Sequence, residues 1–192
     1  GLYAAGEVAS GIRGANRLAG NALTEPQVFG VIAGENAARR ALSPSSTPVL
    51  PAQINLARNR IVEVLNRDKG FDPAEVKDEL TEITSNYVGV IRNEDGLRKA
   101  TKMFDQIKEK KIGNLRLTGE RSFKMLANLL EVENFLIIGE LVTLAAMMRT
   151  ETRGAHNRED YPELDERWLK TIAFQLKDKQ RTVEMKPIVQ TK

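Results

Sequence analysis

Residues 120–149 have the sequence ERSFKMLANLLEVENFLIIGELVTLAAMMR, the longest stretch of the chain with helical periodicity. The middle of this stretch, residues 135–138, is apolar on nearly every side of a helix. We therefore predict one long helix here, placed at the centre of a helical bundle, with residues 135–144 in the core. The apolar residues that mark the helix are Phe123, Leu126, Leu130, Leu136, Leu141, Leu144 and Met148.

Shorter helices are predicted between residue 53 and this stretch. Apolar residues spaced three and four apart mark a helix that ends near Gly70, and Asp72-Pro73-Ala74-Glu75 is a strong start signal for the next. Asn93-Glu94-Asp95 begins another, which ends in the lysine-rich residues 108–111, expected to be solvated. The fold class is thus mainly α, an antiparallel bundle of three to four helices over residues 53–149. The inward residues are Ile54, Ala57, Ile61, Val64 and Leu65, then Val76, Leu80, Ile83 and Tyr87, then Leu97, Ala100, Phe104 and Ile107.

Residues 150–192 have a different character. The first part is highly charged, and Trp168 with Leu169 is expected to anchor it on the bundle. Apolar residues then alternate over 172–176 and again over 183–189, separated by residues 177–180. This pattern predicts a C-terminal β-hairpin with a four-residue loop.

The first 52 residues form two further segments. Residues 2–9 are apolar and small and predict a buried strand, which a glycine-rich loop over 11–21 connects to a helix over 25–42. Thr24 and Gln27 have the spacing of a capping box at the start of that helix. The segment SPSSTPVLP within residues 43–52 predicts a linker. The predicted division is therefore 1–42, 43–52, 53–149 and 150–192.

Composition excludes several classes of protein. The absence of cysteine rules out disulfides, thiolate nucleophiles and iron–sulfur ligation within the chain. A single histidine leaves little room for a metal site, and we expect none. The net charge of +3, from interspersed charges, favours no nucleic-acid partner. No apolar run reaches about 18 residues, so we expect no membrane span.

The beginning of the chain is glycine-rich. It starts GLYAAGEVAS without methionine, and half of its 14 glycines lie in the first 34 residues. We therefore expect a piece of a longer protein. The loop over residues 11–20 lacks both Gly-Lys-Ser/Thr and GxGxxG, so it is either a tight turn or, with the helix that follows it, a site for an anionic or electron-rich group.

Two stretches carry a family resemblance. Residues 1–38, GLYAAGEVASGIRGANRLAGNALTEPQVFGVIAGENAA, closely resemble the end of the flavin-binding domain of the succinate dehydrogenase/fumarate reductase flavoproteins. Residues 150–170, TETRGAHNREDYPELDERWLK, resemble the charged stretch after the helical domain of that family. The resemblance implies that residues 1–42 are the strand, loop and helix that end an FAD-binding domain.

The resemblance also implies site residues. Glu7, in the family's Gly-Glu pair, would hydrogen-bond the flavin nucleotide, and Arg17 would hold a substrate carboxylate. Asn21, Ala22 and Leu23 would open the helix directed at the flavin ring. The implied reaction is hydride transfer between FAD and a C4 dicarboxylate, fumarate or succinate. Where many members have histidine before Gly-Ala-Asn-Arg, this chain has Arg13, which adds a charge beside Arg17.

The implied partners lie outside the chain. They are an upstream flavin and capping domain and an iron–sulfur subunit. Through such partners this otherwise cytoplasmic protein would associate with a membrane. The isolated chain is expected to be inactive. His156 is interpreted as a surface or hydrogen-bonded structural histidine rather than a site residue, and the resemblance implies that its segment helps to dock the helical domain on the flavin domain. The alternatives are an L-aspartate oxidase-like or adenylylsulfate reductase-like flavoprotein, or a non-catalytic helical interaction module.

Overall fold

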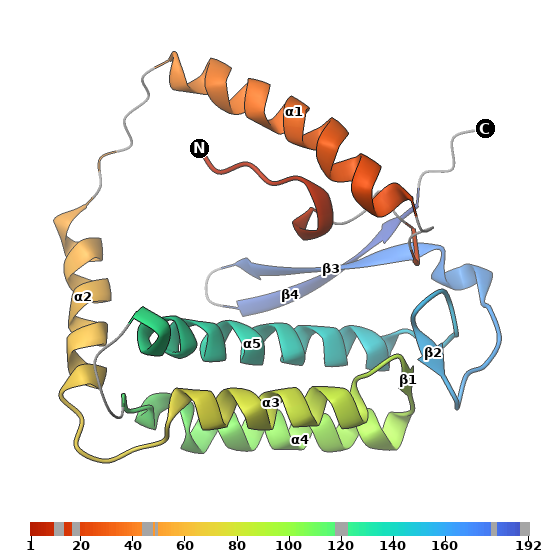
Figure 1. The fold of residues 1–192 in the computed structure, drawn as a ribbon. Helices are drawn as coiled ribbons and strands as arrows, with labels where there is room; N and C mark the ends of the chain where they lie inside the picture. Colours follow the sequence, from red (N-terminus) through yellow and green to blue (C-terminus); the bar gives the residue numbers. More distant parts are fainter. Residues whose placement is uncertain are drawn as a thin grey trace. The chain divides into compact units, whose positions relative to one another are not determined.

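The computed structural model describes residues 1–9, 14–16, 20–43, 48, 50–117, 123–177 and 180–188. It confirms the predicted fold class, mainly helical with a β-hairpin near the C-terminus (Figure 1). The chain divides into two compact units, Gly1–Leu50 and Pro51–Lys192. The first unit contains one long helix, and the second contains the bundle and the hairpin.

Helix α1, Asn21–Ala41, confirms the predicted helix but begins four residues before Glu25. Gly20 occupies the N-cap position and supplies no side chain to the helix end. Thr24 lies inside the first turn, where its hydroxyl donates to the Gly20 carbonyl at 3.4 Å. The capping box predicted at Thr24 is therefore wrong, because the helix begins one turn upstream of it.

The strand predicted over residues 2–9 is also wrong. Gly6–Val8 form a single 3-10 turn, η1, closed by a hydrogen bond from the Ala9 N–H to the Gly6 carbonyl at 2.9 Å. Gly6 has a φ of +79°, which turns the chain where a strand would continue. In the part of the chain that the structure describes, no strand pairs with this segment.

The second unit is built on helices α2 (Pro51–Leu65), α3 (Pro73–Tyr87), α4 (Glu94–Lys110) and α5 (Phe123–Met148). Helices α3, α4 and α5 pack side by side along their lengths (Figure 1). Both predicted starts are confirmed. The Asp72 carboxylate accepts the Ala74 N–H at 2.7 Å, and the Asn93 amide oxygen accepts the Gly96 N–H at 2.9 Å.

The bundle core follows the predicted stripes on α3 and α4. The buried apolar residues of these helices are Val76, Leu80, Ile83, Leu97, Ala100, Phe104 and Ile107, each at most 2% exposed. Phe104 packs against Gly139 of α5, where an added Cβ would lie 3.0 Å from its ring. Gly139 therefore lets α5 approach α4 closely.

The predicted core of α5 is only partly correct. Leu136 is buried, but Phe123 is 92% exposed, and Phe135, Ile137, Ile138 and Val142 are each at least 43% exposed. The buried face contains smaller residues, Gly139, Thr143 and Ala146, with Leu129 and Val132. Because the middle of α5 is apolar on nearly every side, periodicity did not indicate which side meets α3 and α4.

Glycine is required where the chain enters α3. Gly70 has a φ of +154°, and a Cβ there would lie 2.2 Å from the Asn114 carbonyl oxygen. That oxygen accepts the Phe71 N–H, which pairs this segment with the residues after η2 (Ile112–Asn114). An alanine would have to displace this backbone contact.

We therefore expect Gly70→Ala to lower the free energy of unfolding by about 1–3 kcal/mol. Urea unfolding followed by the emission of Trp168, the single tryptophan, measures the change. Gly113→Ala is the matched control, because nothing lies within 4 Å of a Cβ added there. Equal free energies of unfolding for the two variants would show that glycine is not required at position 70.

The segments after α3 and α5 meet in a short parallel pair, β1 (Ile91–Arg92) with β2 (Asn157–Arg158). Farther along, η3 (Glu166–Trp168) leads into the predicted hairpin of β3 (Lys170–Lys177) and β4 (Gln180–Pro187). Lys177 pairs with Gln180, so the connection has two residues instead of four, and both lie outside the described residues. An Arg181–Glu140 ion pair at 2.8 Å joins the hairpin to α5.

Candidate functional site

The predicted flavin-site residues in the first unit come from two elements. Glu7 lies in η1 and is exposed, and Asn21, Ala22 and Leu23 form the first turn of α1. Arg17 falls outside the described residues, as does Arg13. The assignment of all five site residues therefore stays a prediction.

A close contact joins the two elements that carry these residues. A Cβ added to Gly6 would lie 3.0 Å from the Pro26 Cβ in α1, and Gly6 is buried. The turn that carries Glu7 thus packs directly against the N-terminal part of α1. Glu25, next to Pro26, is only 7% exposed. Glycine is needed at position 6 both for its positive φ and for this approach.

The first turn of α1 presents hydrogen-bond donors. The Leu23 N–H bonds to the Gly20 carbonyl at 3.1 Å, whereas the N–H groups of Asn21 and Ala22 precede the first possible intrahelical acceptor. The helix dipole adds partial positive charge at this end. A carboxylate such as Glu7 can accept hydrogen bonds from hydroxyl groups, and the backbone N–H groups of a helix N-terminus can donate to an anionic or electron-rich group.

The second unit contains a buried polar network after α5. The side chain of Glu151 is fully buried and accepts hydrogen bonds from Arg149 at 2.6 Å and from Arg153 at 2.9 Å. It also accepts the Asp165 N–H at 2.9 Å. Burial favours the neutral acid, but the bonds from Arg153, the Asp165 N–H and Arg149 outweigh it and lower the pKa of Glu151 below 4.5.

A second fully buried charge is Arg158 in β2. Its guanidinium donates to Asp160 at 2.7 Å, to Glu94 at 3.1 Å, and to the Ala146 carbonyl near the end of α5 at 2.7 Å. The hydrogen bonds from Arg158 hold the pKa of Asp160 at about 2. One side chain thus ties β2 to both α4 and α5.

The other residues of this unit that were named from the sequence have structural roles. The Trp168 indole N–H donates to the Thr150 hydroxyl at 3.1 Å, and Arg149 lies 5.2 Å from its ring centre, which confirms the predicted anchor. Lys108 and Lys111 are paired with Glu140 and Glu79, so this helix end is not simply solvated. His156 binds Arg92 and the Arg149 carbonyl within its own unit.

Sequence reasoning missed Glu151 and Arg158. Both lie in the stretch interpreted as a charged segment, where acidic and basic residues alternate. That alternation was the available signal, since charges of both signs packed densely after an apolar helix often pair. It did not reveal that the two side chains are fully buried.

The fold is similar to solved flavoenzyme structures. A quinol–fumarate reductase with bound menaquinol aligns with a TM-score of 0.86 and 30% identity, covering 99% of this chain and 34% of that chain. The Mycobacterium smegmatis Sdh1 complex in its apo form gives a TM-score of 0.84 and 29% identity, covering 95% of this chain and 32% of that one. The architecture is therefore that of a helical flavoprotein domain.

Residues 77–192 match the family described as fumarate reductase flavoprotein C-term. The chain belongs to the fumarate reductase/succinate dehydrogenase flavoprotein family, which confirms the resemblance. It is 41% identical over 169 residues to an uncharacterized FAD-dependent oxidoreductase of Methanocaldococcus jannaschii, covering 88% of this chain and 30% of that protein. It is also 41% identical over 177 residues to a fumarate reductase (CoM/CoB) subunit from Methanothermobacter marburgensis, covering 92% and 32%.

A differently named relative is the L-aspartate oxidase of Acinetobacter baylyi, 31% identical over 177 residues, with 90% of this chain and 30% of that protein covered. The chain thus spans about a third of the length of the relatives it matches. Among the described helices, none has the length and apolar content needed to cross a membrane.

Proposed function

We propose that this chain is the C-terminal part of an FAD-dependent oxidoreductase that interconverts fumarate and succinate. In this proposal residues 1–42 supply one wall of the flavin and dicarboxylate site, and residues 53–149 and 150–192 form the helical domain and its tail. The flavin and capping domains belong to the rest of the longer protein. The presence of such further domains is supported by the length of the relatives, of which this chain spans about a third.

The observation that carries the proposal is the contact of Gly6 with Pro26. It supports a site in which an acceptor, Glu7, and the donors of the first turn of α1 face one ligand from two sides.

In the reaction, bound FAD supplies a carrier for two electrons as hydride. Glu7 accepts hydrogen bonds from the nucleotide, and the N–H groups of Asn21 and Ala22 stabilise negative charge at the end of α1. Arg17 binds a substrate carboxylate with its planar, doubly donating guanidinium and so fixes the orientation of the dicarboxylate. Each role is a binding or positioning role, and none requires this chain to move a proton.

We also propose an iron–sulfur partner subunit. Iron–sulfur centres can carry electrons between a flavin and a distant donor, and their ligands are mostly cysteine thiolates. This chain contains no cysteine, so any cluster must be held elsewhere. The similarity to multi-subunit reductase and dehydrogenase complexes supports this arrangement.

A second candidate is an L-aspartate oxidase-like enzyme, favoured by the 31% identity to such a protein. Its substrate would also be a C4 dicarboxylate, so Arg17 would keep its role. The two candidates differ in whether the site accepts an amino group on the substrate.

The test is to assay the longer protein that carries these residues. We expect bound FAD and turnover of fumarate with a reduced dye, and no comparable oxidation of L-aspartate. We expect the 192-residue chain alone to show neither bound flavin nor turnover. A chain that binds FAD in stoichiometric amount and reduces fumarate by itself would refute the proposal, and preferential oxidation of L-aspartate would select the second candidate.

A further inference from the structure

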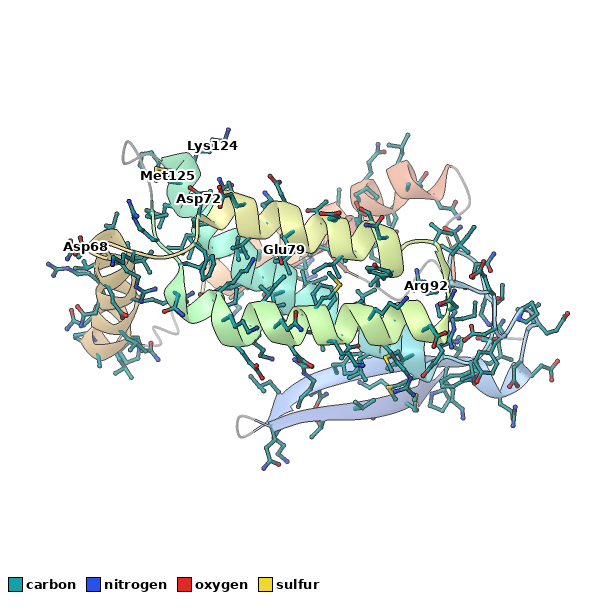
Figure 2. All side chains as sticks on the ribbon, turned by 90° about the horizontal axis from the view of Figure 1, so that it is seen from below. Asp68, Asp72, Glu79, Arg92, Lys124 and Met125 are labelled. Atoms are coloured by element: carbon teal, nitrogen blue, oxygen red, sulfur yellow. The ribbon has the colours of Figure 1, made fainter. Side chains whose placement is uncertain are left out.

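His156 lies between two segments that meet at one end of the bundle. Backbone hydrogen bonds join them, from the Asn157 N–H to the Val90 carbonyl at 3.1 Å and from the Glu159 N–H to the Arg92 carbonyl at 3.0 Å. Figure 2 shows Arg92 where α4 begins, at the end of the bundle away from Asp72. Because β1 and β2 have only two residues each, side chains must contribute to holding the pair together.

The two ring nitrogens of His156 have partners that specify one tautomer. Nε2 lies 3.0 Å from the Arg149 carbonyl oxygen, which can only accept, so Nε2 carries the hydrogen. Nδ1 lies 3.3 Å from Arg92 Nη1, which can only donate, so Nδ1 must present its lone pair. The geometry therefore requires a neutral imidazole with its hydrogen on Nε2.

Protonation of the ring conflicts with this arrangement. An imidazolium has a hydrogen on Nδ1 and cannot accept from Arg92, whereas its bond to the Arg149 carbonyl persists. The charged groups around the ring are three arginines, namely Arg92 from β1, Arg149 after α5 and Arg158 from β2. Their carboxylate partners are Glu151 on Arg149 and, on Arg158, Glu94 and Asp160.

Electrostatics act in the same direction as the geometry. Burial lowers the pKa of His156 below 6.5, its bond to the Arg149 carbonyl raises it, and the charges of Arg92, Arg149 and Arg158 lower it further. The unfolded chain therefore binds this proton more readily than the folded one. Stability from this group is complete above pH 6.5 and falls as the pH drops from 6.5 to the lower folded value.

The Arg92 guanidinium has polar surroundings besides the imidazole of His156. It lines a polar cavity of about 430 Å³ whose other charged lining residues are Asp95, Lys99 and Glu159. Its Nε, which belongs to the planar guanidinium, donates to the Gly89 carbonyl at 2.8 Å, so the guanidinium keeps this partner when Nη1 loses the imidazole.

We propose that the protonation state of His156 controls how firmly β1 and β2 are held together. In the neutral ring, Nδ1 accepts a hydrogen bond from Arg92, which stabilises the pairing of β1 with β2. The protonated ring stays on the Arg149 carbonyl but no longer accepts from Nη1 of Arg92, whose Nε keeps its bond to the Gly89 carbonyl. The base of the hairpin remains in place, because the Arg149 guanidinium still donates to the Trp168 and Lys170 carbonyls, at 2.9 and 2.6 Å.

The 192-residue chain suits a direct test, because it has one histidine and one tryptophan. Nitrogen NMR of labelled histidine follows the ring of His156 through a pH titration. We expect the Nε2–H tautomer at neutral pH and a midpoint below 6.5. Below the midpoint, amide exchange of Asn157 and Glu159, corrected for the chemical rate, should accelerate about fivefold, the effect of losing one hydrogen bond.

Internal controls separate release of β1 from general unfolding. The Phe71 and Arg116 amides, bonded at the other end of the bundle, and the emission of Trp168 should not change over the same pH range. In His156→Gln, amide exchange of Asn157 and Glu159, corrected for the chemical rate, should no longer change over the pH range in which His156 titrates. If that variant does not fold, Arg92→Gln should show fast exchange at Asn157 and Glu159 at every pH. A midpoint at or above 6.5, an Nδ1–H tautomer, or unchanged exchange on protonation would overturn the proposal.

Discussion

Replacing Arg17 by alanine in the longer flavoprotein is expected to lower kcat/KM for fumarate by about 100-fold or more, because a positioned cation at a reacting substrate contributes on that scale. Bound FAD should remain at the wild-type level, since Glu7 and the first turn of α1 hold the nucleotide in the proposal. A guanidinium binds a carboxylate with two parallel hydrogen bonds, which a lysine cannot reproduce. Arg17→Lys should therefore recover only part of the loss.

Arg39→Ala is the matched control for this substitution. Arg39 is exposed on α1, where it pairs with Glu35 one turn away at 3.4 Å, so its loss removes the same charge from the same unit. We expect turnover within a factor of about two of wild type, because exposed pairs of this kind contribute little. If Arg17→Ala retains turnover, the assignment of Arg17 is wrong. If it loses FAD as well, the loop has a structural role instead.

The parts of the fold that could be predicted are those that local chemistry determines. Asp72 and Asn93 cap their helices as the sequence indicated, because a short side-chain oxygen next to a helical run has one favourable partner, the N–H two or three residues on. The stripes on α3 and α4 are clear for a related reason, as each helix has one apolar face. The hairpin followed from simple alternation over residues 172–176.

The failures arise where distant contacts decide. On α5 the residues at the closest contact are small, and Gly139 faces Phe104 while larger residues such as Ile138 stay exposed. Packing, not hydrophobicity, selects that face. The predicted strand over residues 2–9 lacked a partner among the described residues, and a strand cannot satisfy its backbone alone.

The functional residues were likewise predicted only in part. Resemblance supplied Glu7 and Asn21, and the structure adds the contact of Gly6 with Pro26 that brings their elements together. The network around Glu151 and Arg158 was missed because burial of a charge depends on partners far apart in sequence. Glu94 and Arg158, for example, are 64 residues apart.

Glu151→Ala is expected to lower the free energy of unfolding by about 3–5 kcal/mol, the usual effect of removing one partner from a buried ion pair. The substitution would leave Arg149 and Arg153, which are 16% and 22% exposed, without their shared carboxylate. It would also leave the Asp165 N–H without its acceptor. Urea unfolding followed by the emission of Trp168 reports on this region, because Arg149 contacts the indole ring.

Glu163→Ala separates the effect of burial from that of charge. Glu163 lies in the same loop and is exposed, so its loss changes the net charge equally. We expect a change within about 0.5 kcal/mol for it. Glu151→Gln should fall between the two, because the amide keeps an oxygen acceptor but not the negative charge. The free energy of unfolding of a whole domain is about 5–15 kcal/mol, so a loss of the expected size would make this one carboxylate decisive for folding. Similar values for Glu151→Ala and Glu163→Ala would instead mean that water replaces the carboxylate, and that the buried network contributes no more than a surface pair.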